Sequence, residues 1–202
     1  MADVKATVYI ATSIDGFIAR ENGSIDWLDS GADGAGEDYG YAQFMSTVDA
    51  LVMGRRTWET VRTLGAWPYG KTPVVVLSSK KVDIPRELAK TVSTMGGRVD
   101  AIVNALAARE LHHLYVDGGN TIQRFLNAGA IQRLIITRIP VLIGSGIPLF
   151  GKLDRGDVRL RHVLTRSFPS GLVQSAYEIA SAPRRRTTKA QRKSRISKAR
   201  KA

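Results

Sequence analysis

Three short stretches of the sequence carry residue types that suit the binding of phosphate groups. They are Gly54-Arg55-Arg56-Thr57, Ser78-Ser79 and Gly118-Gly119-Asn120-Thr121. Arginine side chains can donate two parallel hydrogen bonds to a phosphate, and serine hydroxyls add further donors. A glycine lacks the Cβ atom, so its backbone can approach a phosphate closely. Together the three stretches predict a site for a phosphorylated ligand.

Each stretch also has an ordinary interpretation. The glycine pair at 118–119 could be a plain turn from a strand to a helix, and exposed arginines such as Arg55 are usually solvated. Residues 117–121 read Asp-Gly-Gly-Asn-Thr, which does not match the G-x-G-x-x-G fingerprint of dinucleotide-binding domains. A standard Rossmann domain is therefore not indicated, and the prediction depends on the three stretches occurring together.

Hydrophobic patterns predict a strand immediately before each stretch. Residues 50–53, 72–77 and 111–116 form short apolar runs, which are typical of strands buried on both faces of a parallel sheet. The carboxyl ends of parallel strands lie at one edge of the sheet, where α/β proteins bind their ligands. We therefore expect the three stretches to converge at that edge.

The rest of the chain completes an α/β pattern. Further strands are expected at 5–12, 92–95 and 134–139, helices at 38–48, 57–64, 99–109 and 121–128, and an antiparallel hairpin at 159–165 and 172–179. Residues 13–36 read as a long loop with several glycines, and such loops are often functional lids. The predicted fold is a single α/β domain with a mixed, mostly parallel sheet that is flanked by helices and ends in a C-terminal antiparallel hairpin.

The amino-acid composition excludes several kinds of chemistry. The chain has no cysteine, which excludes disulfides, thiolate catalysis and zinc sites with sulfur ligands. Two of its three histidines, His112 and His113, are neighbours that would point to opposite sides of a strand, so we expect no metal site. The sequence shows neither a signal peptide nor a membrane-spanning run, and we expect a cytoplasmic protein that contacts no membrane.

The net charge of +12 is concentrated near the end of the sequence. Residues 183–202 contain ten lysines or arginines and no acidic residue, which leaves 20 basic and 18 acidic residues in the rest of the chain. We divide the chain into a folded domain, residues 1–181, and a basic tail, residues 182–202, which we expect to be disordered. The tail is either a solvated extension or a segment that contacts nucleic acid or another acidic surface.

Longer motifs in the same regions resemble a known enzyme family. Residues 52–59, Val-Met-Gly-Arg-Arg-Thr-Trp-Glu, closely resemble the Met-Gly-Arg-x-Thr-Trp-Glu segment of dihydrofolate reductases, and residues 76–79 and 116–119 resemble two later motifs of that family. The opening at 11–19, Ala-Thr-Ser-Ile-Asp-Gly-Phe-Ile-Ala, is similar instead to the reductase domain of riboflavin biosynthesis, as are residues 140–150. The chain thus resembles the dihydrofolate reductase-like superfamily, in the branch of the riboflavin-biosynthesis reductase domain, as a stand-alone reductase without a deaminase domain.

The resemblance implies NADPH as the cofactor. One group of residues would hold the 2′-phosphate that distinguishes NADPH from NADH: Arg55, Arg56, Ser78 and Ser79. Thr57 and the Gly118-Gly119 turn would lie at the pyrophosphate, and Ala11 and Ile14 would touch the nicotinamide end. The complete set of implied cofactor-binding residues is Ala11, Ile14, Gly54, Arg55, Arg56, Thr57, Leu77, Ser78, Ser79, Gly118, Gly119, Asn120, Thr121 and Ile122.

The candidate residues on the substrate side are mainly acids in or next to the long loop. In hydride transfer the cofactor carries the chemistry, while an acid can hold a nitrogen heterocycle and help to protonate it. We expect Asp15 and Asp38 to be catalytic, and Asp15, Asp26, Trp27 and Asp38 to bind the substrate. Asp38 stands where dihydrofolate reductases keep their pterin-binding acid, but it could equally cap a helix. Asp15 could be a turn residue before Gly16, and Trp27 could pack against the core.

The predicted activity is the NADPH-dependent transfer of a hydride to a flat nitrogen heterocycle. The expected substrate is a ribosylaminopyrimidine of riboflavin synthesis or a pterin, and the expected assembly, by analogy with relatives, is a homodimer. Two alternatives remain open. One is a dihydrofolate reductase proper, against which the opening motif at 11–19 argues. The other is a non-catalytic protein that binds nucleotides or uses its basic tail to bind nucleic acid.

Overall fold

The structure of the protein is a computed structural model that describes residues 3–31, 37–154 and 156–180. The strands in these ranges are β1 (Lys5–Ser13), β2 (Phe17–Ala19), β3 (Ala50–Gly54), β4 (Val74–Leu77), β5 (Val92–Met95), β6 (His113–Asp117), β7 (Arg133–Ile139), β8 (Ile147–Pro148), β9 (Leu160–Ser167) and β10 (Val173–Ile179). The helices are α1 (Tyr41–Met45), α2 (Arg55–Val61), α3 (Val99–Ala107) and α4 (Gly119–Asn127), together with a 3₁₀ helix at Asp26–Gly31.

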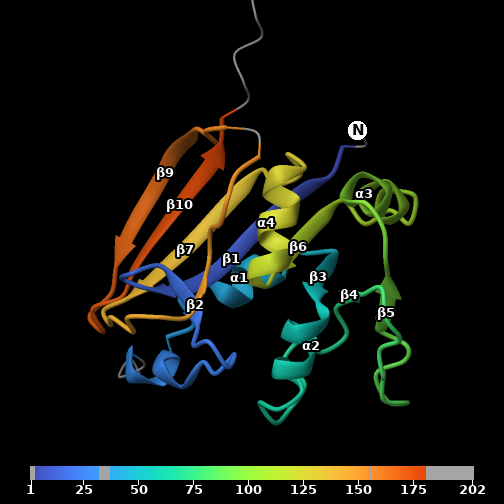
Figure 1. The fold of residues 1–202 in the computed structure, drawn as a ribbon, viewed down its shortest axis with the longest axis horizontal. Coiled ribbons are helices and arrows are strands. Elements are labelled where there is room, and N and C mark those ends of the chain that lie inside the picture. Colours follow the sequence, from blue (N-terminus) through green and yellow to red (C-terminus); the bar gives the residue numbers. More distant parts are fainter. Residues whose placement is uncertain (1–2, 32–36, 155, 181–202) are drawn as a thin grey trace, which may run out of the picture.

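Eight of the strands form one sheet in the order β5-β4-β3-β6-β1-β7-β10-β9 (Figure 1). The six strands from β5 to β7 in this order are parallel to one another, whereas β10 is antiparallel to both β7 and β9. The predicted α/β domain, with a mixed, mostly parallel sheet and a C-terminal antiparallel hairpin, is therefore confirmed.

Helices cover both faces of the parallel part of the sheet. On one face, α3 and α4 bury Ile102, Leu106 and Phe125 against the strands. On the other face, α1 and α2 contribute Phe44 and Trp58 to a second apolar layer. Because β4 lies between these two layers, all four of its residues are apolar and buried. This double burial explains why the sequence shows an uninterrupted apolar run there rather than an alternating one.

The segment that we predicted as one long loop contains short regular elements. After β1, Gly16 adopts a φ of 87°, and the chain turns into β2. β2 pairs with β8 in an antiparallel two-stranded sheet. Gly146, next to β8, lies so close to β2 that a Cβ atom there would be 2.3 Å from the carbonyl oxygen of Ala19. The pairing joins segments far apart in the sequence, so local periodicity gave no sign of it.

Three helices have bounds that differ from the prediction and bear on the site. The helix expected at 38–48 is only Tyr41–Met45, preceded by Gly40 in a left-handed conformation with a φ of 85°. α2 and α4 begin earlier than predicted, at Arg55 and Gly119. The predicted phosphate-binding residues at 55–57 and 119–122 therefore lie in the first turns of two helices.

No helix in the described part of the chain is both long and apolar enough to cross a bilayer. The basic tail at 182–202 lies outside the described residues. The boundary between the domain and the tail therefore stays a prediction.

Candidate active site

The three predicted phosphate-binding stretches lie side by side at the carboxyl edge of the sheet. β3 ends at Gly54, and it pairs with β4, which ends at Leu77, and with β6, which ends at Asp117. Arg55 begins α2 directly after β3, and Gly119 begins α4 one residue after β6. The expected convergence of these segments at one edge is confirmed.

The turns after β3 and β6 touch each other through their glycines. Gly118 has a φ of 87°, and a Cβ atom added to it would lie 2.2 Å from Thr57 Oγ1. A Cβ atom at Gly54 would lie 2.9 Å from Thr121 Oγ1. Both glycines are therefore required for the starts of α2 and α4 to pack together.

The start of α4 has the features of an anion-binding helix terminus. Its N-cap residue, Gly118, has no side chain that could cap the first N–H groups, and no acidic residue lies in its first turn. These N–H groups and the positive end of the helix dipole favour a negatively charged ligand. Asn120 is exposed at this turn, whereas Thr121 and Ile122 are buried, so those two can serve a ligand only through their backbone.

A crevice of about 460 Å³ lies at the ends of β4 and β5. The described residues that line it are Arg55, Leu77, Ser78, Ser79, Lys80, Gly96, Gly97, Ile102 and Arg124. Four of them were predicted to bind the cofactor, three are cations, and none of these lining residues is acidic. The crevice therefore suits a group with concentrated negative charge.

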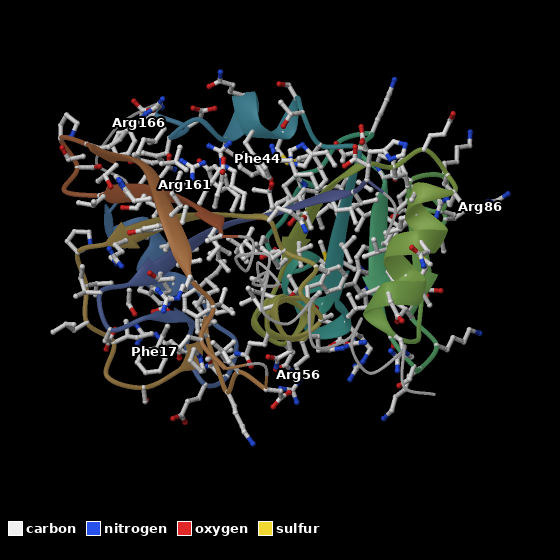
Figure 2. All side chains as sticks on the ribbon, turned by 90° about the horizontal axis from the view of Figure 1, so that it is seen from above. Phe17, Phe44, Arg56, Arg86, Arg161 and Arg166 are labelled. Atoms are coloured by element: carbon white, nitrogen blue, oxygen red, sulfur yellow. The ribbon has the colours of Figure 1, made fainter. Side chains whose placement is uncertain are left out.

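The two neighbouring arginines at the start of α2 differ in position. Arg55 lines the crevice, and its Nη1 lies 2.5 Å from Glu59 Oε1 one helical turn later. Both side chains are about half exposed, so this ion pair contributes only ~0.5 kcal/mol, and a phosphate can compete with Glu59 for the guanidinium group. Arg56 is exposed and is not among the described residues that line the crevice; Figure 2 shows it well apart from Phe44.

The two serines after β4 differ in what their hydroxyl groups can bind. The Ser78 hydroxyl donates to the carbonyl oxygen of Lys80 at 2.8 Å and accepts from the N–H of Lys80 at 3.0 Å. Ser79 is exposed at the crevice. Ser78 therefore fixes the turn that presents Ser79 and Lys80.

Five described residues of the crevice were not among the predicted site residues: Gly96, Gly97, Arg124, Lys80 and Ile102. Gly96 and Gly97 follow β5, and Arg124 on α4 donates from Nη2 to the carbonyl oxygen of Gly97 at 3.0 Å. A glycine pair after an apolar strand repeats the pattern at 118–119, so the sequence did carry a signal for the first two. Arg124 lies within a helix, and only the packing of α4 beside the end of β5 brings it to the crevice.

A second cavity, of about 210 Å³, lies at the ends of β1 and β7, and we call it the aromatic cavity. The described residues that line it are Tyr9, Ala11, Leu28, Asp38, Tyr39, Tyr41, Thr137, Ile139 and Leu172. Most of these side chains are aromatic or aliphatic, which suits a flat ring. Of the predicted site residues, Ala11 and Asp38 reach this cavity.

Asp38 lies in the wall of the aromatic cavity and also binds the start of α1. Its carboxylate accepts hydrogen bonds from the N–H groups of Ala42 at 2.8 Å and Gly40 at 2.9 Å. These two bonds, with that from Ala42 as the larger cause, lower the pKa of Asp38. The ionised carboxylate can accept hydrogen bonds from the N–H groups of a heterocycle, but it is a poor proton donor.

Asp15 and Asp26 are not among the described residues that line either cavity. Asp15 accepts a hydrogen bond from the N–H of Gly144 at 2.8 Å, and its bond with the Ser13 hydroxyl is the main reason that its pKa is lowered. Asp26 forms an ion pair with Arg20 at 2.7 Å, and hydrogen bonding to Arg20 lowers the pKa of Asp26 to about 2. Both carboxylates therefore stabilise the conformation of loops: Asp15 binds the segment at Gly144, and Asp26 binds Arg20.

Ile14 and Trp27 also lie outside the described linings of the two cavities. The side chain of Ile14 is 55% exposed. Trp27 is buried and packs with Ile139 and Leu172, which are residues of the aromatic cavity wall. Trp27 thus supports that wall, as in the alternative interpretation that it packs against the core.

Asp117 was not predicted as a site residue, yet it is the carboxyl group best suited to hold a proton. It lies partly buried at the end of β6, accepts a hydrogen bond from the N–H of Gly118 at 2.8 Å, and burial raises its pKa to about 6. Burial and, second, the charge of Asp117 raise the pKa of Tyr41, a residue of the aromatic cavity wall, to about 12. The position before the glycine pair was visible in the sequence, but its burial was not.

Comparisons with known proteins agree with this arrangement. The family model of the RibD C-terminal domain matches residues 4–174. The uncharacterised protein YwjB of Bacillus subtilis is 39% identical over 166 residues, which cover 81% of this chain and 92% of that protein. Among solved structures, a protein of Shewanella sp. PV-4 that is named for riboflavin biosynthesis is 37% identical, with a TM-score of 0.82 over 90% of this chain and 100% of that chain.

A dihydrofolate reductase from Enterococcus faecalis, solved in complex with NADP(H), shares the fold. It is 17% identical, with a TM-score of 0.61, and the match covers 90% of this chain and 99% of that chain. The resemblance to the dihydrofolate reductase-like superfamily and its riboflavin branch is therefore confirmed. On the extent of the family match, this chain belongs to the RibD C-terminal domain family.

Proposed function

We propose that this chain is an NADPH-dependent reductase that transfers a hydride to a flat nitrogen heterocycle. The observation that carries the proposal is the arrangement of sites along one sheet edge. The cationic crevice lies beyond β4 and β5, the aromatic cavity lies beyond β1 and β7, and the Gly118-Gly119 turn after β6 lies between them. Such an edge offers groups for the phosphates of a dinucleotide at one end and a pocket for a ring at the other.

The crevice favours the 2′-phosphate of NADPH over the 2′-hydroxyl of NADH. Arg55, Lys80 and Arg124 line it, and none of its described lining residues is an acid that could accept a hydrogen bond from the hydroxyl. Each hydrogen bond from a charged donor contributes ~1.5–3 kcal/mol. The first turn of α4 would bind the pyrophosphate, and Ala11 would lie at the nicotinamide end. The cofactor, when bound, supplies the hydride.

Asp117 is our candidate for holding the proton that the reduction requires. With a pKa of about 6, roughly one tenth of this group is protonated at neutral pH, and the proton is readily exchanged. The predicted donors Asp15 and Asp38 both have lowered pKa values and stay ionised. We therefore propose that Asp38 binds the N–H groups of the heterocycle. Asp117 is not among the described residues that line either cavity, but its charge raises the pKa of Tyr41 in the wall of the aromatic cavity, and we propose that Asp117 holds the proton.

The family favours a pyrimidine of riboflavin synthesis as the heterocycle, in the manner of a 5-amino-6-(5-phosphoribosylamino)uracil reductase. A pterin is the second candidate, because the dihydrofolate reductase of Enterococcus faecalis shares the fold. We further propose that the enzyme works as a cytoplasmic homodimer. The possible contact of the basic tail with nucleic acid stays a prediction.

The loss of NADPH absorbance on mixing with candidate substrates tests the proposed reaction. The riboflavin-pathway pyrimidine, dihydrofolate and other pterins should be compared at one enzyme concentration, with Asp38→Asn and Asp117→Asn as matched variants. We expect turnover with the pyrimidine and a strong reduction of turnover in Asp117→Asn. Turnover of dihydrofolate alone would point to the alternative of a dihydrofolate reductase proper. Failure to bind NADPH would show that the chain is not a reductase of this kind.

A further inference from the structure

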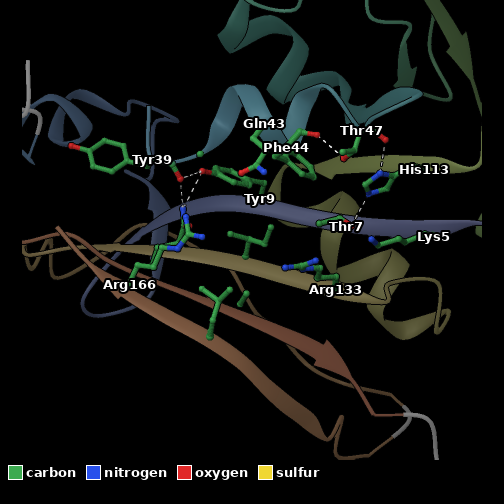
Figure 3. A pocket seen from close by; sticks show the side chains of 15 residues that line it. Lys5, Thr7, Tyr9, Tyr39, Gln43, Phe44, Thr47, His113, Arg133 and Arg166 are labelled. Atoms are coloured by element: carbon green, nitrogen blue, oxygen red, sulfur yellow. Dashed lines mark hydrogen bonds between the residues drawn. The ribbon is translucent and has the colours of Figure 1, made fainter. Parts of the chain in front are cut away.

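A third cavity, of about 320 Å³, lies on the sheet face that carries α1, over strands β1, β7, β10 and β9 (Figure 3). We call it the α1-face pocket. None of its described lining residues lines the cofactor crevice. The proposed cofactor site therefore makes no use of this pocket.

The α1-face pocket lies next to the aromatic cavity, and the two share lining residues that are hydrogen-bonded to each other. Tyr9 and Tyr39 belong to the linings of both. The Tyr9 hydroxyl donates to the carbonyl oxygen of Tyr39 at 2.8 Å, and the side-chain amide of Gln174 donates to the same oxygen at 3.1 Å. These bonds fix the two tyrosines that the cavities share, whereas the other described lining residues of the α1-face pocket line neither the aromatic cavity nor the crevice.

The charged side chains of the α1-face pocket are all cations. Lys5, Arg133 and Arg166 line it, and its described lining includes no acid. Figure 3 shows Lys5 and Arg133 at one end of the pocket and Arg166 toward the other. Other arginines of the described chain form ion pairs with carboxylates: Arg20–Asp26, Arg55–Glu59, Arg62–Asp83, Arg98–Asp100 and Arg161–Glu178. The three cations of the pocket form no ion pair with any described residue, so their charge is available to a ligand.

One of the arginines that line the pocket has a buried hydrogen-bond donor that is not satisfied by a described residue. The Nε atom of Arg133 is buried and has no hydrogen-bond partner among the described residues. Leaving such a donor unsatisfied destabilises a fold by ~1–3 kcal/mol. The Arg133 guanidinium group also forms no ion pair with a described residue, so its positive charge is not compensated within the described fold. The end formed by Lys5 and Arg133 is therefore the natural place for a negatively charged group.

His113 lies at the same end but adds no charge. Burial is the main reason that its pKa is lowered, and the charges of Lys5 and Arg133 lower it further. The neutral ring donates from Nδ1 to the carbonyl oxygen of Thr47 at 2.6 Å, so Nε2 accepts from the hydroxyl of Thr7 at 3.0 Å. Both ring nitrogens are engaged, which leaves Lys5 and Arg133 to bind an anion.

Part of the lining of the α1-face pocket is apolar. Phe44, Ile135 and Leu164 contribute to it, and the ring of Phe44 stacks on Tyr9 with centroids 4.9 Å apart. We propose that the α1-face pocket binds a small organic anion, with its charged group between Lys5 and Arg133 and its apolar body against Phe44, Ile135 and Leu164. This site goes beyond the proposed reductase function and does not depend on it.

Calorimetric titration with phenyl phosphate, benzoate and inorganic phosphate tests the proposal. Excess NADPH is added to occupy the crevice, and Arg133→Met is compared with Arg161→Met, which removes the same charge outside the described lining. Of phenyl phosphate and benzoate, the one that binds the unchanged protein more tightly is used for the comparison. We expect Arg133→Met to raise its Kd by about tenfold or more, and Arg161→Met to change its Kd by less than about twofold. Inorganic phosphate should bind more weakly than phenyl phosphate because it lacks the apolar body. Neither arginine lines the crevice, so the comparison holds even if the chain does not bind NADPH.

Three results would overturn the proposal. The first is an equal Kd for Arg133→Met and Arg161→Met. The second is inorganic phosphate binding as tightly as both organic anions, which would indicate an adventitious ion only. The third is the absence of organic-anion binding together with a change from dimer to monomer in Arg133→Met, which would make the pocket a contact between two copies of the chain. If Arg133→Met does not fold, as judged by its near-ultraviolet circular dichroism, Lys5→Met takes its place.

Discussion

Replacing Gly118 with alanine tests whether the two helix starts at the sheet edge must touch. The substitution forces an L-residue into a φ of 87° and places a Cβ atom 2.2 Å from Thr57 Oγ1. Gly118 has a ψ of 133°, outside the left-handed helical region, and a residue with a Cβ atom in such a conformation is strained by about 1–3 kcal/mol. The forced displacement of a packed neighbour costs about 1–3 kcal/mol more, so we expect Gly118→Ala to lower the free energy of unfolding by about 2–6 kcal/mol.

Gly16→Ala is a control for an alanine at positive φ without a steric contact. Gly16 also has a φ of 87°, but a Cβ atom there would meet no atom within 4 Å. Its substitution should lower the free energy of unfolding by only about 1–2 kcal/mol. A larger loss in Gly118→Ala is expected because only this variant also forces a contact with Thr57.

Urea unfolding of the two variants and of Gly118→Ala/Thr57→Ala measures this contact. The double variant lacks Thr57 Oγ1 and should recover most of the difference, apart from the loss that Thr57→Ala causes alone. NADPH titrations should show weaker binding for Gly118→Ala than for Gly16→Ala, because only the first displaces the start of α4. Equal losses of stability in both single variants, or no recovery in the double variant, would refute the reasoning.

Two further predictions concern the carboxylates. Because the folded-state pKa of Asp117, about 6, lies above its ordinary value of 3.8, the fold loses stability as the pH rises through this window, by up to about 3 kcal/mol. Asp117→Asn should remove this loss and be more stable than the unchanged protein at neutral pH. If urea unfolding gives the same difference in free energy of unfolding between the two proteins at about pH 4 and at about pH 7, a buried Asp117 is ruled out. Asp38→Asn should raise the KM for the heterocycle by about tenfold, whereas Asp26→Asn, outside both described linings, should change it by less than about twofold; similar effects of the two substitutions on KM would argue against Asp38 as the substrate-binding acid.

The sequence predicted the sheet edge because its signals there are local. The apolar run at 72–77 marks a strand buried on both faces, and the glycines and polar residues that follow each strand mark the edge. Since parallel strands end at the same edge, these local patterns were sufficient to bring the three stretches together.

The sequence could not predict properties that depend on packing between distant segments. Arg124 reaches the crevice only because α4 lies beside the end of β5, and the raised pKa of Asp117 follows from its burial. Arg55 and Arg56 are equivalent in sequence, but the helix that begins at Arg55 turns only the first of them toward the crevice. The candidate acids looked alike as well, yet Asp26 has Arg20 as its partner, and of the three candidates Asp15, Asp26 and Asp38, all described in the structure, Asp38 is the one that lines a cavity.

The ratio of the Kd values for NADH and NADPH in Arg55→Gln and Arg56→Gln tests the central claim most directly. Arg55 lines the crevice and Arg56 is not part of its described lining, so the two variants remove the same charge from adjacent positions. The Arg55→Gln variant loses one charged hydrogen bond to the 2′-phosphate, which is worth about 1.5–3 kcal/mol. Its Kd for NADPH should therefore rise about tenfold or more, while its Kd for NADH should stay almost unchanged. Arg56→Gln should alter the ratio little. Equal weakening of both dinucleotides by Arg55→Gln would contradict a 2′-phosphate site in the crevice.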